Sequence, residues 1–156
     1  MNEFKIELKW GLLFSLVTIL WMGGEKIIGL HQTYSNLQFL IGIPYFFIFL
    51  LGMMDKKRRY YHGKISFKEG IRFGLVLSLI VALLTPIVQY IVFNYVSPDY
   101  LPNMIKYMVD NGRMDQASAD SFFSLGNQIK SSAYINLVMG VLTSALIALF
   151  LKNKLN

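Results

Sequence analysis

Long apolar runs separated by short polar segments make up most of the chain. A helix needs about 20 mainly apolar residues to cross the hydrocarbon core of a bilayer. Four runs approach this length and predict spanning helices over about residues 10–30, 37–54, 67–96 and 131–151. The first is interrupted by Glu25 and Lys26, whereas residues 73–96 carry no charge. The pattern predicts an all-α fold, an integral membrane four-helix bundle that forms a single transmembrane domain over residues 1–156.

A polar signal marks the start of the third helix. Ser66 is followed three residues later by Glu69, which matches a capping box. In this motif each of the two side chains accepts a hydrogen bond from a backbone N–H group that the first turn leaves unpaired. The third helix should therefore begin near Phe67.

A sizeable polar segment, residues 97–130, separates the third run from the fourth. Its first part has four apolar residues at helical spacing, namely Met104, Ile105, Met108 and Val109. Asn111-Gly112 then indicates a helix end, and Asp115 is typical of a helix start. We predict two short amphipathic helices that lie on the outer membrane surface. Whether the second is continuous with the fourth span stays open.

Composition supports the membrane class. Hydrophobic residues make up 54% of the chain and charged residues 15%, which is too apolar for an ordinary soluble domain. The net charge of +6 does not indicate a nucleic-acid partner, because most basic residues lie just outside the apolar runs. The absence of cysteine excludes disulfides, thiolate metal sites and cysteine nucleophiles.

The basic residues also predict an orientation. Eleven lie on one side of the predicted spans and four on the other, and together they are the 15 Lys and Arg residues of the chain. Cytoplasmic loops are enriched in Lys and Arg. We therefore expect a multi-pass protein of the bacterial inner membrane, with both termini and the basic loop after the second span in the cytoplasm. Residues 97–130 would then be extracytoplasmic.

Four polar residues lie at a similar depth in the predicted spans, about four turns from the cytoplasmic end at a rise of ~1.5 Å per residue. They are Glu25, Gln38, Gln89 and Asn136. Because a carboxylate inside a bilayer is costly, such a layer is a candidate site for a ligand or a proton. Alternatively, Glu25 pairs with Lys26 or reaches the headgroups with it, and the amides join helices to one another. Both interpretations stay open at this point.

Small residues recur at helical spacing in every predicted span. In the fourth they are Gly140, Ser144 and Ala148. Small residues let helices approach closely in lipid, so these stripes should face the bundle interior. The stripe of the fourth span is also the candidate contact face for a second copy of the chain or for a membrane-protein partner.

A basic cluster follows the second apolar run and consists of Lys56, Lys57, Arg58 and Arg59. Each basic residue near the cytoplasmic leaflet contributes about 1 kcal/mol of attraction to anionic lipid. The cluster is therefore a candidate contact for membrane lipids. It also serves as a topology signal, and the two roles are compatible.

Residue patterns for catalysis are missing from the sequence. There is no glycine-rich phosphate loop, no His-Glu pair on a helix and no serine in a nucleophile elbow. Neither of the two histidines has a second ligand at metal spacing. We expect that the protein is not an enzyme and has no catalytic, cofactor or metal site.

Two stretches resemble a known family. The first is Asp55-Lys56-Lys57-Arg58-Arg59 followed by residues 63–70, Gly-Lys-Ile-Ser-Phe-Lys-Glu-Gly. The second joins Tyr107-Met108 and Asn111-Gly112 to a closing span over residues 140–152. Together they are similar to a bacterial family of uncharacterised four-helix membrane proteins, domain-of-unknown-function family 4199. The resemblance implies a multi-pass membrane location and carries no activity or functional residues with it.

The sequence thus leaves two main functional hypotheses. The first is a structural or accessory membrane protein that acts through helix packing, as a homo-oligomer or as a subunit of a complex. The alternative is a binder of a small molecule or ion, or a transporter subunit, which uses the polar layer around Glu25. A polar cavity at that layer, open to one side, would favour the alternative.

Overall fold

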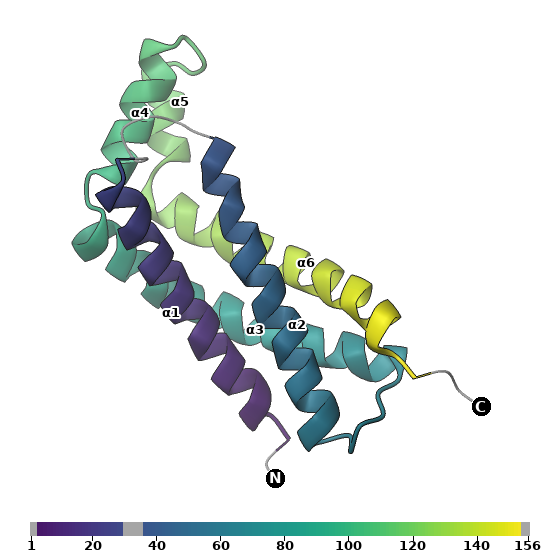
Figure 1. Cartoon of the computed structure of the whole chain (residues 1–156). Coiled ribbons are helices and arrows are strands. Elements are labelled where there is room, and N and C mark those ends of the chain that lie inside the picture. Colours follow the sequence, from purple (N-terminus) through teal and green to yellow (C-terminus); the bar gives the residue numbers. More distant parts are fainter. Residues whose placement is uncertain (1–2, 30–35, 154–156) are drawn as a thin grey trace.

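The computed structural model describes residues 3–29 and 36–153, and these form an all-α fold without a strand in the described part. Four long helices run side by side as a bundle, as Figure 1 shows. They are α1 (Lys5–Ile27), α2 (Gly42–Arg59), α3 (Phe67–Ile91) and α6 (Leu125–Leu151). Each is long and apolar enough to cross a membrane. The second candidate span, Phe39–Arg59, includes part of the preceding short helix, and the third, Phe67–Val96, includes the short helix that follows α3.

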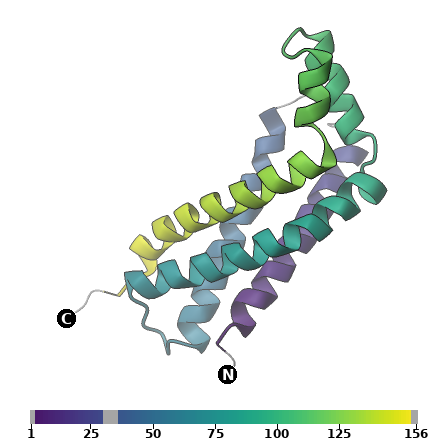
Figure 2. The same ribbon diagram turned by 180° about the vertical axis from the view of Figure 1, so that it is seen from behind.

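Short elements connect the long helices. The 3-10 helix η2 (Asn36–Ile41) leads directly into α2. The π-helix η3 (Val92–Val96) prolongs α3, and the backbone N–H of Ser97 donates to the carbonyl of Val92 at 2.7 Å. The helices α4 (Tyr100–Asp110) and α5 (Gln116–Phe122) then form a hairpin at the end of the bundle away from the two chain ends (Figures 1 and 2).

The predicted start of the third helix is confirmed. The Ser66 hydroxyl accepts from the backbone N–H of Glu69 at 3.3 Å, and the Glu69 carboxylate accepts from the backbone N–H of Ser66 at 2.7 Å. Both halves of the capping box are therefore present, and α3 begins at Phe67.

Three other boundaries differ from the prediction. The first helix begins at Lys5 rather than near residue 10, and residue 30 lies outside the described part. The second continues to Arg59, because cations in a last turn are favourable beside the negative end of the helix dipole. The fourth begins at Leu125 rather than residue 131, because the Ser124 hydroxyl caps it by accepting from the N–H of Asn127 at 3.3 Å.

The polar segment is helical, as predicted, and its apolar stripe is covered only in part, because three of its four residues are half-buried. Contact of this stripe with a membrane surface stays a prediction. α4 packs against α5, and Met104 of the stripe is buried, as is Ala119 of α5. The Asp115 carboxylate caps α5 by accepting from the hydroxyl and the backbone N–H of Ser118. The hydrogen bond from the Ser118 hydroxyl, followed by the one from its backbone N–H, holds the pKa of the Asp115 carboxyl below its ordinary value.

Helices α3 and α6 pack closely through their small residues. A Cβ atom added to Gly74 would lie 2.0 Å from the Cβ of Ser144, and one added to Gly70 would lie 2.6 Å from the Cβ of Ala148. Gly140 faces Ser78 in the same way. The stripes of α3 and α6 therefore face the interior, as predicted, whereas Gly42 of the second span is exposed. The α6 stripe is covered by α3, however, so its predicted use as a contact face for another protein is wrong.

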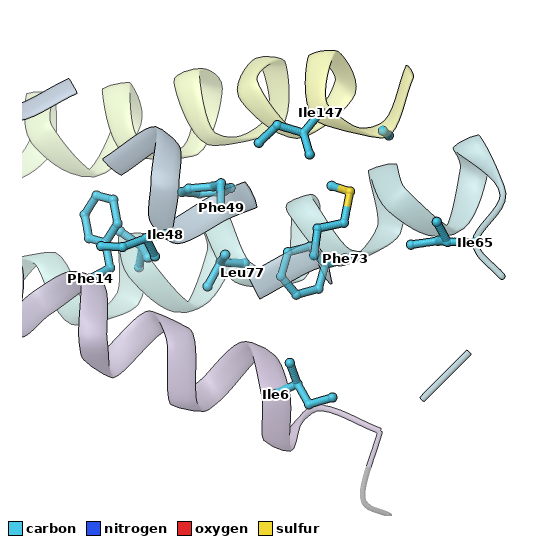
Figure 3. Close-up of a cluster of buried hydrophobic side chains, with 11 residues drawn as sticks. Ile6, Phe14, Ile48, Phe49, Ile65, Phe73, Leu77 and Ile147 are labelled. Atoms are coloured by element: carbon cyan, nitrogen blue, oxygen red, sulfur yellow. The ribbon is translucent and has the colours of Figure 1, made fainter. Parts of the chain in front are cut away.

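The four long helices share an apolar core near the end of the bundle that carries the chain ends. Side chains from all four meet in this cluster (Figure 3), which includes Phe14, Phe49, Leu77 and Ile147. Outside the core, large apolar side chains are exposed along every long helix, and Phe150 is 80% exposed. Soluble proteins rarely expose so much apolar surface, whereas lipid accommodates it. The distribution indicates a membrane protein.

Candidate functional site

A cavity of about 250 Å³ lies between the long helices in the half of the bundle nearer to α4 and α5. Hydroxyl and amide side chains supply most of its polar wall: Ser15, Thr18, Tyr45, Thr85, Gln89, Tyr100, Gln128, Ser132 and Asn136. Apolar side chains complete it: Phe14, Met22, Ile41, Val81, Val88, Phe93 and Ile135. No charged side chain lines the cavity among the residues that the structure describes. It can therefore offer hydrogen bonds and apolar contacts to an uncharged molecule.

Hydrogen bonds fix the wall on the side of α1 and α2. The Thr18 hydroxyl donates to the carbonyl of Phe14 at 2.9 Å and lies 2.8 Å from the Tyr45 hydroxyl. Because the hydrogen of Thr18 is used within its own helix, Tyr45 donates to Thr18. The ring of Tyr45 also stacks on Phe14, with centroids 4.0 Å apart. The Tyr45 hydroxyl is thus held in place with its oxygen able to accept a further bond.

Hydrogen bonds also join α3 to α6 across the cavity. The amide nitrogen of Asn136 donates to the Thr85 hydroxyl at 3.1 Å, and Thr85 in turn donates to the carbonyl of Val81 at 2.9 Å. The amide nitrogen of Gln89 donates to the Ser132 hydroxyl at 2.9 Å.

These bonds leave unused hydrogen-bonding groups at the cavity wall. Within the described part of the chain, no donor pairs with the side-chain carbonyl oxygen of Gln89 or Asn136. The Ser132 hydroxyl accepts from Gln89, and no acceptor in the described residues takes its own hydrogen. The wall can therefore receive two hydrogen bonds at amide oxygens and donate one from a hydroxyl.

The predicted polar layer is partly assembled at this cavity. Gln89 and Asn136 both line it, whereas the side chain of Gln38 lies outside the described part of the structure. Glu25 is 5% exposed and so lies within the bundle, one turn beyond the cavity residue Met22. Its carboxylate accepts from the indole N–H of Trp21 at 2.6 Å.

The cavity rather than Glu25 is thus the centre of the candidate site. The described residues that line it do not include Glu25. The Glu25 carboxylate does not extend to the headgroups together with Lys26, because Glu25 is buried. The Lys26 ammonium donates instead to the backbone carbonyl of Val96 at 2.9 Å. A functional role of Glu25 itself stays a prediction.

The predicted polar layer included two of the nine described polar residues of the wall, and those outside it include Tyr100, Gln128 and Ser132. Gln128 and Ser132 lie two turns and one turn before Asn136, so the helical spacing of the α6 stripe already pointed to them. They were missed because the fourth span was expected to begin near residue 131. Tyr100 belongs to α4, and no sequence signal linked it to the spans.

At the opposite end of the bundle, Lys56 is buried. It is 2% exposed, and its ammonium lies 2.9 Å from the Glu7 carboxylate while also donating to the backbone carbonyl of Glu3. The ammonium lies 4.1 Å from the centre of the Tyr60 ring. The predicted contact between Lys56 and anionic lipid is therefore wrong, because a charge enclosed by α1 and paired with Glu7 does not reach a headgroup.

The remaining members of the basic cluster differ in their surroundings. Lys57 donates to the carbonyl of Leu151 at 2.8 Å, which joins the end of α2 to the end of α6. The exposed guanidinium of Arg59 pairs with Asp55 at 2.6 Å, and Arg58 is exposed. Lipid contact through Lys57, Arg58 and Arg59 stays a prediction.

Comparison with known proteins places the chain in a family. A family model described as a protein of unknown function, DUF4199, matches residues 9–153, which include every described residue of the cavity wall. No curated protein and no solved structure matches the chain. The match covers nearly all of the four long helices, and the chain therefore belongs to the DUF4199 family.

Proposed function

We propose that this protein is a multi-pass, non-enzymatic protein of the bacterial inner membrane that binds a small, uncharged molecule in the cavity between α1, α2, α3 and α6. The observation that carries the proposal is the cavity wall, which combines fixed hydroxyl and amide groups with apolar surface. Its volume of about 250 Å³ lies just below the range of roughly 300 to 1,000 Å³ typical of ligand pockets. A ligand smaller than a typical drug would fit.

The unused groups of the wall support a ligand with hydrogen-bonding capacity. Within the described part of the chain, no hydrogen bond occupies the amide oxygens of Gln89 and Asn136 or the hydroxyl hydrogen of Ser132, and these half-buried side chains line the cavity. A molecule that carries both a donor and an acceptor would satisfy these groups. Ordered water is the competing occupant.

A structural or accessory role loses its main support. The hypothesis relied on the small residues of α6 as a contact face, and α3 covers these residues. A role in a homo-oligomer or a complex would therefore need another face. If mass spectrometry finds no molecule that purifies with the protein, the structural or accessory role becomes the favoured hypothesis again.

The proposed topology has both termini and the α2–α3 connection in the cytoplasm, with the α4–α5 hairpin outside. It is supported by the basic residues near the chain ends and by the common position of both ends in the bundle (Figure 1). The chain has no cysteine, so single cysteines can report exposure without a background. In intact cells with a permeable outer envelope, a membrane-impermeant maleimide should label Arg113→Cys. Lys64→Cys should react only after lysis, and the reverse pattern would contradict the topology.

The binding proposal predicts a molecule that purifies with the protein. Ser15→Phe should abolish its retention, because Ser15 lines the cavity and, among the described residues, its hydroxyl bonds to the carbonyl of Gly11 within α1 and to no other helix. Filling the cavity at this position therefore breaks no hydrogen bond between helices. The measurement is mass spectrometry of organic and aqueous extracts of protein taken from cell membranes without detergent.

Ser131→Phe is the matched control, since it makes the same change beside the cavity residue Ser132 without lining the cavity itself. Wild type and Ser131→Phe should retain a compound that Ser15→Phe lacks. Both variants should keep the helical content of wild type by circular dichroism. Extracts that do not differ between Ser15→Phe and the other two proteins would overturn the binding proposal.

A further inference from the structure

A second cavity, of about 450 Å³, lies beside the first between α2 and α6. Its wall is mainly apolar and includes Phe39, Phe46, Phe49 and Met139. Five residues line both cavities: Phe14, Ile41, Tyr45, Ile135 and Asn136. The two spaces therefore share a wall, with the hydrogen-bonding groups concentrated on one side of it and the aromatic and aliphatic groups on the other.

The apolar cavity reaches the outer surface of the bundle. Among its lining residues, Phe39 is 72% exposed and Met139 is 56% exposed. Gly42, at the start of α2, also lines the cavity, and a Cβ atom added there would meet nothing within 4 Å. In a membrane this opening between α2 and α6 would face the hydrocarbon rather than water, because the surrounding surface is apolar.

We infer that the two cavities together bind an uncharged amphiphile, a lipid-like molecule whose polar head occupies the first cavity while its apolar chain leaves through the second. This inference rests on the proposed function and names the class of ligand. The head would bond to Gln89 and Asn136, and the chain would lie along Phe46 and Met139 toward the bilayer.

The walls also select against a charged head. Neither cavity is lined by a charged side chain in the described part of the structure. An ion buried without a counter-charge or coordinating groups is strongly disfavoured. An alcohol or amide head can donate to the amide oxygens of Gln89 and Asn136 and accept from the Ser132 hydroxyl, whereas a carboxylate or phosphate anion has no hydrogen to donate to these oxygens.

Photolabelling of the purified full chain in lipid nanodiscs tests this inference. The probes are hexadecanol and palmitic acid, each with a diazirine near the end of the chain, applied at pH 8 so that the acid is charged. We expect the alcohol to label peptides of α2 and α6 around Phe46 and Met139, and the acid to label them about tenfold less, which corresponds to about 1.4 kcal/mol.

Gly42→Leu should fill the apolar cavity and lower labelling by the alcohol about tenfold. Gly126→Leu is the matched control, because Gly126 also lies in a helix, meets nothing within 4 Å of an added Cβ and does not line either cavity. Met139→Trp provides a second blocking variant if Gly42→Leu does not fold. Unchanged labelling in the folded blocking variant would overturn the inference, and equal labelling by the acid would overturn the selection for an uncharged head.

The outcomes also separate this inference from the proposed function. If blocking the apolar cavity changes nothing while Ser15→Phe still removes a co-purified compound, a polar ligand binds but no chain extends between α2 and α6. If neither cavity variant changes labelling or co-purification, both the inference and the proposed function fail.

Discussion

Gly74→Leu should prevent the bundle from assembling. A Cβ atom at this position would lie 2.0 Å from the Cβ and 3.5 Å from the Cα of Ser144, so a larger side chain must push α3 and α6 apart. Overpacking in a core typically costs about 1 to 3 kcal/mol. The cost should be at or above the upper end here, because the neighbouring atoms belong to or adjoin the backbone of α6. Size-exclusion chromatography and circular dichroism in detergent should show little folded, monodisperse protein.

The same substitution at Gly126 is the control. Gly126 lies in α6, and an added Cβ there would meet nothing within 4 Å. Gly126→Leu should therefore purify like wild type. A milder pair, Gly74→Ala with and without Ser144→Gly, should show that removing the opposing side chain restores much of the lost stability. Equal yields and thermal stabilities for Gly74→Leu and Gly126→Leu would contradict the close packing of α3 on α6.

Glu7→Leu should lower the free energy of unfolding by about 3 to 5 kcal/mol, the usual cost of leaving a buried charge without its partner. Lys56 and Glu7 are both nearly inaccessible, and their charged groups lie 2.9 Å apart. Glu3 supplies Lys56 with only a backbone carbonyl, and Tyr60 supplies it with only a ring face. Reversible unfolding in mixed micelles, followed by circular dichroism, measures the change.

A double variant identifies the cause. Glu7→Leu with Lys56→Met removes both charges and should recover most of the loss, because apolar residues of similar size often replace a buried ion pair without penalty. Lys9→Met tests an exposed pair: Lys9 lies 3.2 Å from Asp55 with its side chain 59% exposed, so its removal should cost no more than about 1 kcal/mol. A double variant as unstable as Glu7→Leu would show that the buried charge is not the cause.

Much of the fold could be predicted because lipid imposes a length and a composition on each span. The four apolar runs gave the four long helices, and the Ser66–Glu69 pair gave the start of α3. The last turn of α2 and the first residues of α6 could not be placed in this way. A run of four basic residues resembles a loop, yet it is also a favourable last turn of a helix. Ser124 was not recognised as a cap, because it lies inside the polar segment.

The candidate site could be predicted only in part, for a similar physical reason. Gln89 and Asn136 were predicted to lie at the same depth in the membrane, and both line the cavity. This depth could be predicted because the rise per residue of a helix is fixed. Which helix faces which depends on packing that one sequence does not reveal. The burial of Lys56 required knowing that Glu7, far away in sequence, lies against the end of α2. In the same way, small residues on α6 showed that a close contact exists but not that α3 makes it.

The most direct test of the binding site is an experimental structure of the protein in discs cut from its own membrane, with no ligand added. We expect density for a bound molecule in the cavity of about 250 Å³, in contact with the amide oxygens of Gln89 and Asn136. Density that continues between α2 and α6 would further support an apolar chain. A cavity that holds only ordered water, or that the protein's own side chains fill, would contradict the proposed function.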